Sequence, residues 1–202
     1  MTRIKICGLS RKRDIDYVNE ALPDYVGFVF APSRRRVSYE KAVGLKKMLD
    51  RYIKAVGVFA DAPQDEILRL CDGGVIDIVQ LHGTEMPEYA CKLKSYGCTV
   101  IKAISMQGQN TERELKIWEQ TDVDYLLLDN GRGGTGESFD YSLIGERTKP
   151  FFLAGGLTPE NIQKAVNEVK PYAVDLSSGV ETQGLKNRKK IIDAVRSVRN
   201  YE

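Results

Sequence analysis

The chain has 202 residues, of which 42% are hydrophobic and 29% are charged, a composition typical of a globular protein with one core. A net charge of +2 and the lack of any run of about eighteen apolar residues exclude nucleic acid and membranes as expected partners. The first residues lack the apolar run of a signal peptide and the four cysteines form no Cys-x-x-Cys pair, so we expect a reduced cytoplasmic protein with one domain over residues 1–202.

A short β-forming run, a turn and an amphipathic helix recur along the chain. Eight such runs begin near Arg3, Tyr25, Ile53, Ile76, Thr99, Val123, Pro150 and Pro171. Helix signals follow them: Ser38 is a favourable N-cap residue, and Thr158 precedes a proline suited to the first helical position. This repeat predicts an α/β fold in which a parallel sheet closes into a (β/α)8 barrel, with an open doubly wound sheet as the alternative.

The strand ends carry the functional prediction, because barrel chemistry lies where strands end and βα loops begin. Strand alternation places Lys5 and Cys7 on the interior face of the first strand. A lysine inside a barrel needs a partner, and Asp175 in the eighth strand is the candidate. A cation beside Cys7 would favour its thiolate. Lys102 in the fifth strand is also flanked by apolar residues, and the sequence indicates no partner for it.

Polar side chains follow the second and fourth strands. Arg34, Arg35 and Arg36 come after the second strand, where a guanidinium would bind a planar carboxylate and at most one or two of the three can point inward. Gln80 and His82 end the fourth strand on one face. We expect both in the wall of the site as polar contacts.

Asp129 ends an apolar run in the sixth strand. A carboxylate buried there without a partner would be costly. At a strand end it can face a pocket whose apolar surroundings raise its pKa and keep a proton available; a cap for the following loop is the alternative. That loop, residues 131–139, is rich in glycine and fits either a flap over a substrate, with Gly134 in the site, or a plain surface loop.

Glycine-rich turns follow the last two strands. They contain Gly155 and Gly156 after the seventh strand, and Ser178 and Gly179 after the eighth. Glycine lets the backbone approach a ligand and turn its amide groups outward as donors. Because barrel enzymes often bind phosphate with these two loops, the four residues are predicted to bind a phosphate, with simple tight turns as the alternative.

The strand-end motifs together resemble one enzyme family, the phosphoribosylanthranilate isomerases of tryptophan biosynthesis. The motifs run in the family's order from Lys5 to Glu181: KICGL, GFVFAPSRRRVS, VQLHG, LLLDN with GGTGESFD, LAGGLTPENI and VDLSSGVE. The resemblance implies a (β/α)8 barrel that converts N-(5′-phosphoribosyl)anthranilate into 1-(o-carboxyphenylamino)-1-deoxyribulose 5-phosphate by an Amadori rearrangement. It also implies a small phosphorylated substrate as partner, no cofactor or metal, and a monomer or homodimer.

The same resemblance implies roles for individual residues. Cys7 in KICG falls on the family's general base, and Asp129 falls on its general acid. Arg35, in the stretch from Ser33 to Ser38, falls on the arginine that holds the anthranilate carboxylate, with Arg34 and Arg36 as alternatives. The phosphate-binding residues are the four of the last two loops, and the remaining substrate-site residues are Gln80, His82, Gly134 and Asp175.

Two other functions remain as rivals at this point. One is another phosphosugar isomerase or epimerase barrel. A histidine-pathway sugar isomerase uses two aspartates as acid and base, whereas this chain has the thiol of Cys7 at the first strand end. A metal-dependent epimerase needs several ligands, and His82 is the one histidine of the sequence. The other rival is a non-catalytic module that binds a phosphorylated ligand, which needs no facing acid and base.

Overall fold

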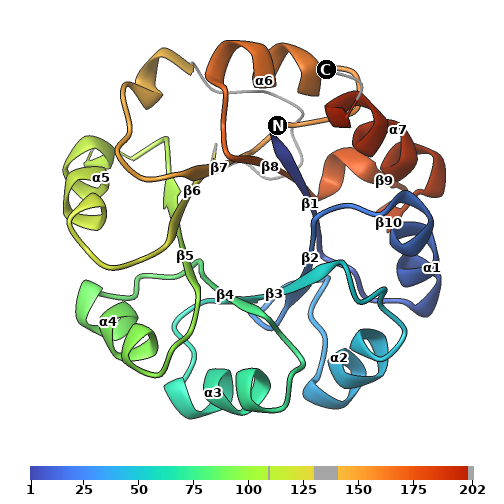
Figure 1. Cartoon of the computed structure of the whole chain (residues 1–202), viewed down its shortest axis with the longest axis horizontal. Coiled ribbons are helices and arrows are strands. Elements are labelled where there is room, and N and C mark those ends of the chain that lie inside the picture. The colour runs from blue at the N-terminus through green and yellow to red at the C-terminus, as the bar shows by residue number, and fades with distance from the viewer. Residues whose placement is uncertain (109, 130–140, 200–202) are drawn as a thin grey trace.

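Eight parallel strands close into a barrel in which each strand pairs with its neighbours along the chain and the last pairs with the first (Figure 1). The structure is a computed structural model that describes residues 1–108, 110–129 and 141–199. The strands are β1 (Arg3–Cys7), β2 (Tyr25–Val29), β3 (Lys54–Phe59), β4 (Ile78–Leu81), β5 (Val100–Ser105), β6 (Tyr125–Asp129), β7 (Phe151–Ala154) and β8 (Ala173–Leu176). The predicted (β/α)8 barrel is confirmed, and the open doubly wound sheet is wrong.

Helices surround the strands on the outside of the barrel (Figure 1). They are α1 (Lys12–Ala21), α2 (Tyr39–Lys46), α3 (Gln64–Asp72), α4 (Pro87–Ser95), α5 (Thr111–Glu119), α6 (Ile162–Val169) and α7 (Arg188–Arg199). After β6 the described residues contain a short 3-10 helix, η1 (Tyr141–Ile144), where the repeat predicts an α-helix. After β8 come a second 3-10 helix, η2 (Ser178–Val180), and a small hairpin of β9 (Glu181–Thr182) and β10 (Leu185–Lys186). No described helix has the length and apolar character that crossing a bilayer requires.

The predicted helix caps have different outcomes. Ser38 caps α2, because its hydroxyl accepts a hydrogen bond from the backbone N–H of Lys41. The regular helix α6 begins at Ile162, later than the cap prediction at Thr158 implies. Thr158 nevertheless makes cap-type contacts: its hydroxyl accepts a hydrogen bond from the backbone N–H of Glu160 at 3.3 Å, and its carbonyl accepts from the backbone of Asn161 and Ile162. A turn at the end of the β7 loop therefore precedes the helix.

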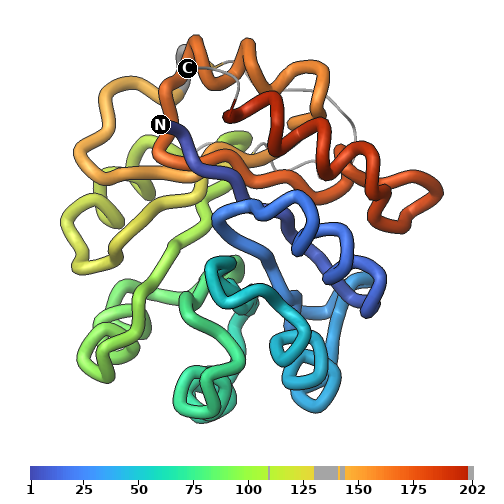
Figure 2. Tube along the Cα trace, turned by 45° about the vertical axis from the view of Figure 1, so that its right-hand side comes forward, coloured from blue at the N-terminus to red at the C-terminus, as the bar shows by residue number. Residues whose placement is uncertain are grey.

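The two ends of the chain meet where the barrel closes. Figures 1 and 2 show the N-terminal β1 and α1 beside the C-terminal β8 and α7. Side chains alternate across β1. Ile4 and Ile6 are fully buried between the sheet and the surrounding helices, whereas Lys5 points into the barrel, on the same face of the strand as Cys7. At the opposite end of the barrel from Cys7, rings of Tyr25 and Phe152 pack within a layer of aromatic side chains.

Two buried lysines of the strands have carboxylate partners. Lys5 Nζ lies 2.8 Å from Asp175 Oδ2, and the two residues are register partners on β1 and β8. This pairing confirms the prediction. Lys102 donates to the carboxylate of Glu85 at 2.8 Å and to the carbonyl of Gly83 at 2.7 Å. Both buried charges are therefore neutralised, and Lys102 holds the loop that follows β4 in place.

Candidate active site

A pocket of about 400 Å³ opens at the carboxyl ends of the strands, a size typical of small-molecule sites. Every predicted site residue that the structure describes lines it: Cys7, Arg35, Gln80, His82, Asp129, Gly155, Gly156, Asp175, Ser178 and Gly179. Gly134 and the predicted flap at 131–139 lie outside the described residues. The closed barrel thus brings residues that are far apart in the sequence to one pocket, from the strand ends and from the loops that follow them.

Cys7 ends β1 with only 8% of its surface exposed. Its register partner on β2 is Gly27, where an added Cβ would lie 2.6 Å from Cys7 Sγ. Val29 and Val58 form an apolar cluster with the thiol. Glycine at position 27 therefore makes room for the sulfur, which faces the pocket beside an apolar wall.

The charges around Cys7 act in opposite directions on the thiol. Burial raises the pKa of Cys7, the ammonium groups of Lys5 and Lys186 lower it, and the carboxylate of Asp175 raises it. Burial also disfavours the charged form of Lys5, but Asp175 and Cys7 outweigh it, and the pKa of Lys5 is raised. The cation predicted beside Cys7 is present, yet the net shift of the Cys7 pKa is upward, opposite to the expected stabilisation of a thiolate.

Asp129 faces the pocket from β6, with 23% of its side chain exposed. Its Oδ2 lies 3.6 Å from Nε2 of His82, and Nδ1 of the same imidazole lies 2.9 Å from Nε2 of Gln80. In this orientation the Gln80 amide donates to Nδ1, which leaves the proton of a neutral imidazole on Nε2, toward Asp129. Gln80 thus orients His82 against the carboxylate.

Two buried oxygen atoms of the pocket wall can accept further hydrogen bonds. Gln80 Oε1 and Asp175 Oδ1 have no hydrogen-bond partner among the residues that the structure describes. Buried acceptors of this kind are costly when unpaired. Both residues line the pocket, so their positions fit a ligand that carries hydroxyl groups.

The loops after β7 and β8 form another part of the wall. Gly155 and Gly156 have φ values of 91° and 67°, in the left-handed region that glycine adopts without strain. Asn161 holds this turn by donating to the Gly156 carbonyl at 2.9 Å. A Cβ at Gly179 would clash with the carbonyl oxygen of Leu157, so the two glycine-rich loops are in close backbone contact.

The three consecutive arginines occupy different environments. Arg35 lines the pocket and its side chain is 22% exposed, whereas that of Arg34 is 61% exposed. Arg36 is exposed as well. The Arg35 side chain lies across Gly8, whose φ is 81° and where an added Cβ would clash with Arg35 Cδ. The structure therefore selects Arg35 as the arginine of the pocket wall.

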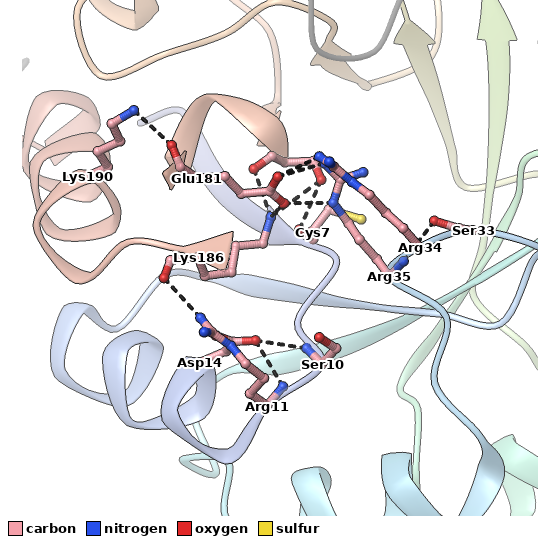
Figure 3. Close-up of polar contacts among 11 residues, drawn as sticks. Cys7, Ser10, Arg11, Asp14, Ser33, Arg34, Arg35, Glu181, Lys186 and Lys190 are labelled. Carbon is pink, nitrogen blue, oxygen red and sulfur yellow. Dashed lines mark hydrogen bonds and ion pairs between the residues drawn. The ribbon is translucent and has the colours of Figure 1, made fainter. Parts of the chain in front are cut away.

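Glu181 and Lys186, two residues that the sequence analysis did not single out, hold Arg35 (Figure 3). Glu181 accepts hydrogen bonds from Nε of Arg35 at 2.7 Å and from Nη2 at 2.9 Å. Lys186 Nζ donates to Glu181 Oε1 at 2.8 Å. The sequence signal that could have found this cluster is the acidic residue that ends the VDLSSGVE motif, since an arginine that points into a pocket wall needs a nearby carboxylate.

Comparisons with known proteins agree on one family. The family model described as N-(5'phosphoribosyl)anthranilate (PRA) isomerase matches residues 4–197. An N-(5'-phosphoribosyl)anthranilate isomerase of Endomicrobium trichonymphae is 44% identical over 99% of this chain and 100% of the relative. The crystal structure of phosphoribosyl anthranilate isomerase from Thermotoga maritima has a TM-score of 0.89 and 36% identity, covering 99% of this chain and 100% of its own. A phosphoribosyl anthranilate isomerase in complex with reduced 1-(o-carboxyphenylamino)-1-deoxyribulose 5-phosphate has a TM-score of 0.86 and 35% identity, with the same coverage.

The rate at which iodoacetamide alkylates Cys7 tests the balance of charges at the thiol. Because burial outweighs the two lysines, the rate should rise with pH through a midpoint above the ordinary cysteine value of about 8.5. Mass spectrometry of the Cys7 peptide measures the rate, and the same chain in denaturant is the control. A midpoint in the folded protein below that of the denatured chain would show that the lysines outweigh burial.

Proposed function

The chain belongs to the N-(5'phosphoribosyl)anthranilate isomerase family, and on this premise we propose that it converts N-(5′-phosphoribosyl)anthranilate into 1-(o-carboxyphenylamino)-1-deoxyribulose 5-phosphate in tryptophan biosynthesis. One observation carries the proposal beyond family membership. A thiol, Cys7, and a carboxyl group, Asp129, line the same pocket from different strands of the barrel. An isomerisation that moves a proton between neighbouring atoms needs an acid and a base in such a position.

In the proposed reaction, Asp129 first donates a proton to the ring oxygen of the ribose, and the ring opens to a cationic imine. The positive charge acidifies the C–H bond at C2′. Cys7, as a thiolate, then removes this proton, and the resulting enolamine tautomerises to the ketone. The acid must be protonated while the base is ionised. Lys5 and Lys186 support ionisation of Cys7 against the effect of burial.

The pocket offers a separate contact for each part of this substrate. The paired glycine-rich loops after β7 and β8 fit the phosphate, as in other barrel enzymes. Arg35 fits the planar carboxylate and the apolar side chains of Val29 and Val58 fit the aromatic ring. The unpaired acceptors of Gln80 and Asp175 fit ribose hydroxyls. Anchoring the substrate at several points would hold C2′ close to the acid and the base.

Neither rival function has an observation in its favour. A histidine-pathway sugar isomerase uses two aspartates as acid and base, whereas a thiol ends β1 here, and a binding module gains nothing from Cys7 and Asp129 in one pocket. The expected oligomeric state, a monomer or homodimer, and the cytoplasmic location stay predictions.

Removal of either proton-transfer group should lower turnover strongly without loss of the fold. Cys7→Ala and Asp129→Asn are each expected to lower kcat by roughly a hundred- to ten-thousandfold, the usual contribution of a general acid or base. The loss of phosphoribosylanthranilate fluorescence measures the rate, and circular dichroism checks the fold. Full turnover by both variants would show that neither Cys7 nor Asp129 transfers a proton in the reaction.

Substitution of the arginines one at a time tests the carboxylate contact. Arg35→Ala should raise KM by roughly tenfold or more, since a hydrogen bond to a charged group contributes about 1.5–3 kcal/mol. Arg34→Ala is the matched control and should change KM much less, because its side chain lies outside the pocket wall. A large effect of Arg34→Ala with none of Arg35→Ala would show that the assignment to Arg35 is wrong.

A further inference from the structure

We propose that Glu181 is a positioning residue that fixes the guanidinium of Arg35, so that one edge of it stays free to bind the carboxylate of the substrate. The proposal rests on the function proposed above and adds a determinant of substrate specificity to it. Glu181 belongs to the β9–β10 hairpin beside the pocket and is not in the pocket lining. It acts through Arg35, without contact to the reacting atoms.

The geometry of the contact supports this role. A guanidinium has two edges that can each hold a carboxylate with two parallel hydrogen bonds. Glu181 occupies the edge formed by Nε and Nη2, at 2.7 and 2.9 Å. No hydrogen bond among the described residues engages Nη1 of Arg35. The second edge, formed by Nη1 and Nη2, therefore remains for a ligand carboxylate.

The charges of the cluster favour an anionic ligand. Three cations, Arg34, Arg35 and Lys186, share the single carboxylate of Glu181 (Figure 3). Burial alone would raise the pKa of Glu181, but the hydrogen bonds from Arg35 and Lys186 hold it below its usual value. Glu181 thus stays ionised at neutral pH. The cluster keeps an excess of positive charge, which a substrate carboxylate at Arg35 would offset.

Glu181 itself is held rigidly, as a positioning residue must be. Lys186 is almost fully buried and donates both to Glu181 and to the backbone carbonyl of Ser177 at 2.7 Å. The carbonyl of Lys186 in turn accepts a hydrogen bond from Arg11, which ties the hairpin to the start of α1. Without the carboxylate of Glu181, the cations would repel one another and the guanidinium of Arg35 would lose the two hydrogen bonds that orient it.

Kinetics of Glu181→Gln and Glu181→Ala test the proposal. Each variant should raise KM for phosphoribosylanthranilate by roughly tenfold, equivalent to about 1.4 kcal/mol, and leave kcat within a few-fold of the wild type. In calorimetry, affinity for reduced 1-(o-carboxyphenylamino)-1-deoxyribulose 5-phosphate should fall, whereas affinity for inorganic phosphate should not. A purely structural role would lower the melting temperature and affect both ligands. If Glu181→Gln fails to fold, Glu181→Asp keeps the charge and should still raise KM.

A double-mutant cycle shows whether Glu181 acts through Arg35. The double variant Arg35→Ala with Glu181→Gln should have the same KM as Arg35→Ala alone. Once the guanidinium of Arg35 is removed, the change at position 181 has no guanidinium to displace. Glu20→Gln is the matched control. Glu20 accepts hydrogen bonds from Nε and Nη2 of Arg188 on the outer surface, as Glu181 does from Arg35, and its loss should leave KM unchanged. Additive effects in the cycle, or an unchanged KM in the Glu181 variants, would overturn the proposal. No turnover by the wild type would instead overturn the proposed function.

Discussion

The ammonium group of Lys5 lies inside the barrel with no solvent exposure, and it keeps its charge there because the carboxylate of Asp175 lies 2.8 Å away. The two residues are register partners on β1 and β8, the strands whose pairing closes the barrel. Two residues further along β1, on the same face, stands Cys7. The same buried ion pair therefore joins the two strands that close the barrel and places a charged ammonium group near the thiol of Cys7.

The environment of Cys7 follows from this arrangement. The absence of a side chain at Gly27 makes room for the sulfur beside an apolar wall. Only 8% of Cys7 is exposed, and burial favours the neutral thiol. Lys5 and Lys186 oppose burial without overcoming it. A thiol that is largely protonated is also less open to alkylation and oxidation. In the proposed reaction the thiolate is needed only at the step that takes the C2′ proton.

Much of this could be predicted from the sequence because strand parity is a local property. The pleat fixes which side of β1 carries Lys5 and Cys7, and the order of a closed barrel places β8 beside β1, which predicted Asp175 as partner. The cluster of Arg35, Glu181 and Lys186 could not be predicted in this way. It depends on how the loop after β2 meets the hairpin after β8, a contact between residues 146 positions apart. The direction of the Cys7 pKa was missed for a similar reason, since the depth of burial is set by the whole fold.

Replacement of both members of the buried pair by apolar side chains, Lys5→Met with Asp175→Leu, separates its structural role from its electrostatic role. Such replacements are often neutral for stability, so the double variant should fold. The decisive measurement is the pH midpoint of Cys7 alkylation in this variant. We expect it to lie above that of the wild type, because Lys5 lowers the pKa of the thiol more strongly than Asp175 raises it. An unchanged or lower midpoint in the folded variant would contradict the claim that this pair tunes Cys7.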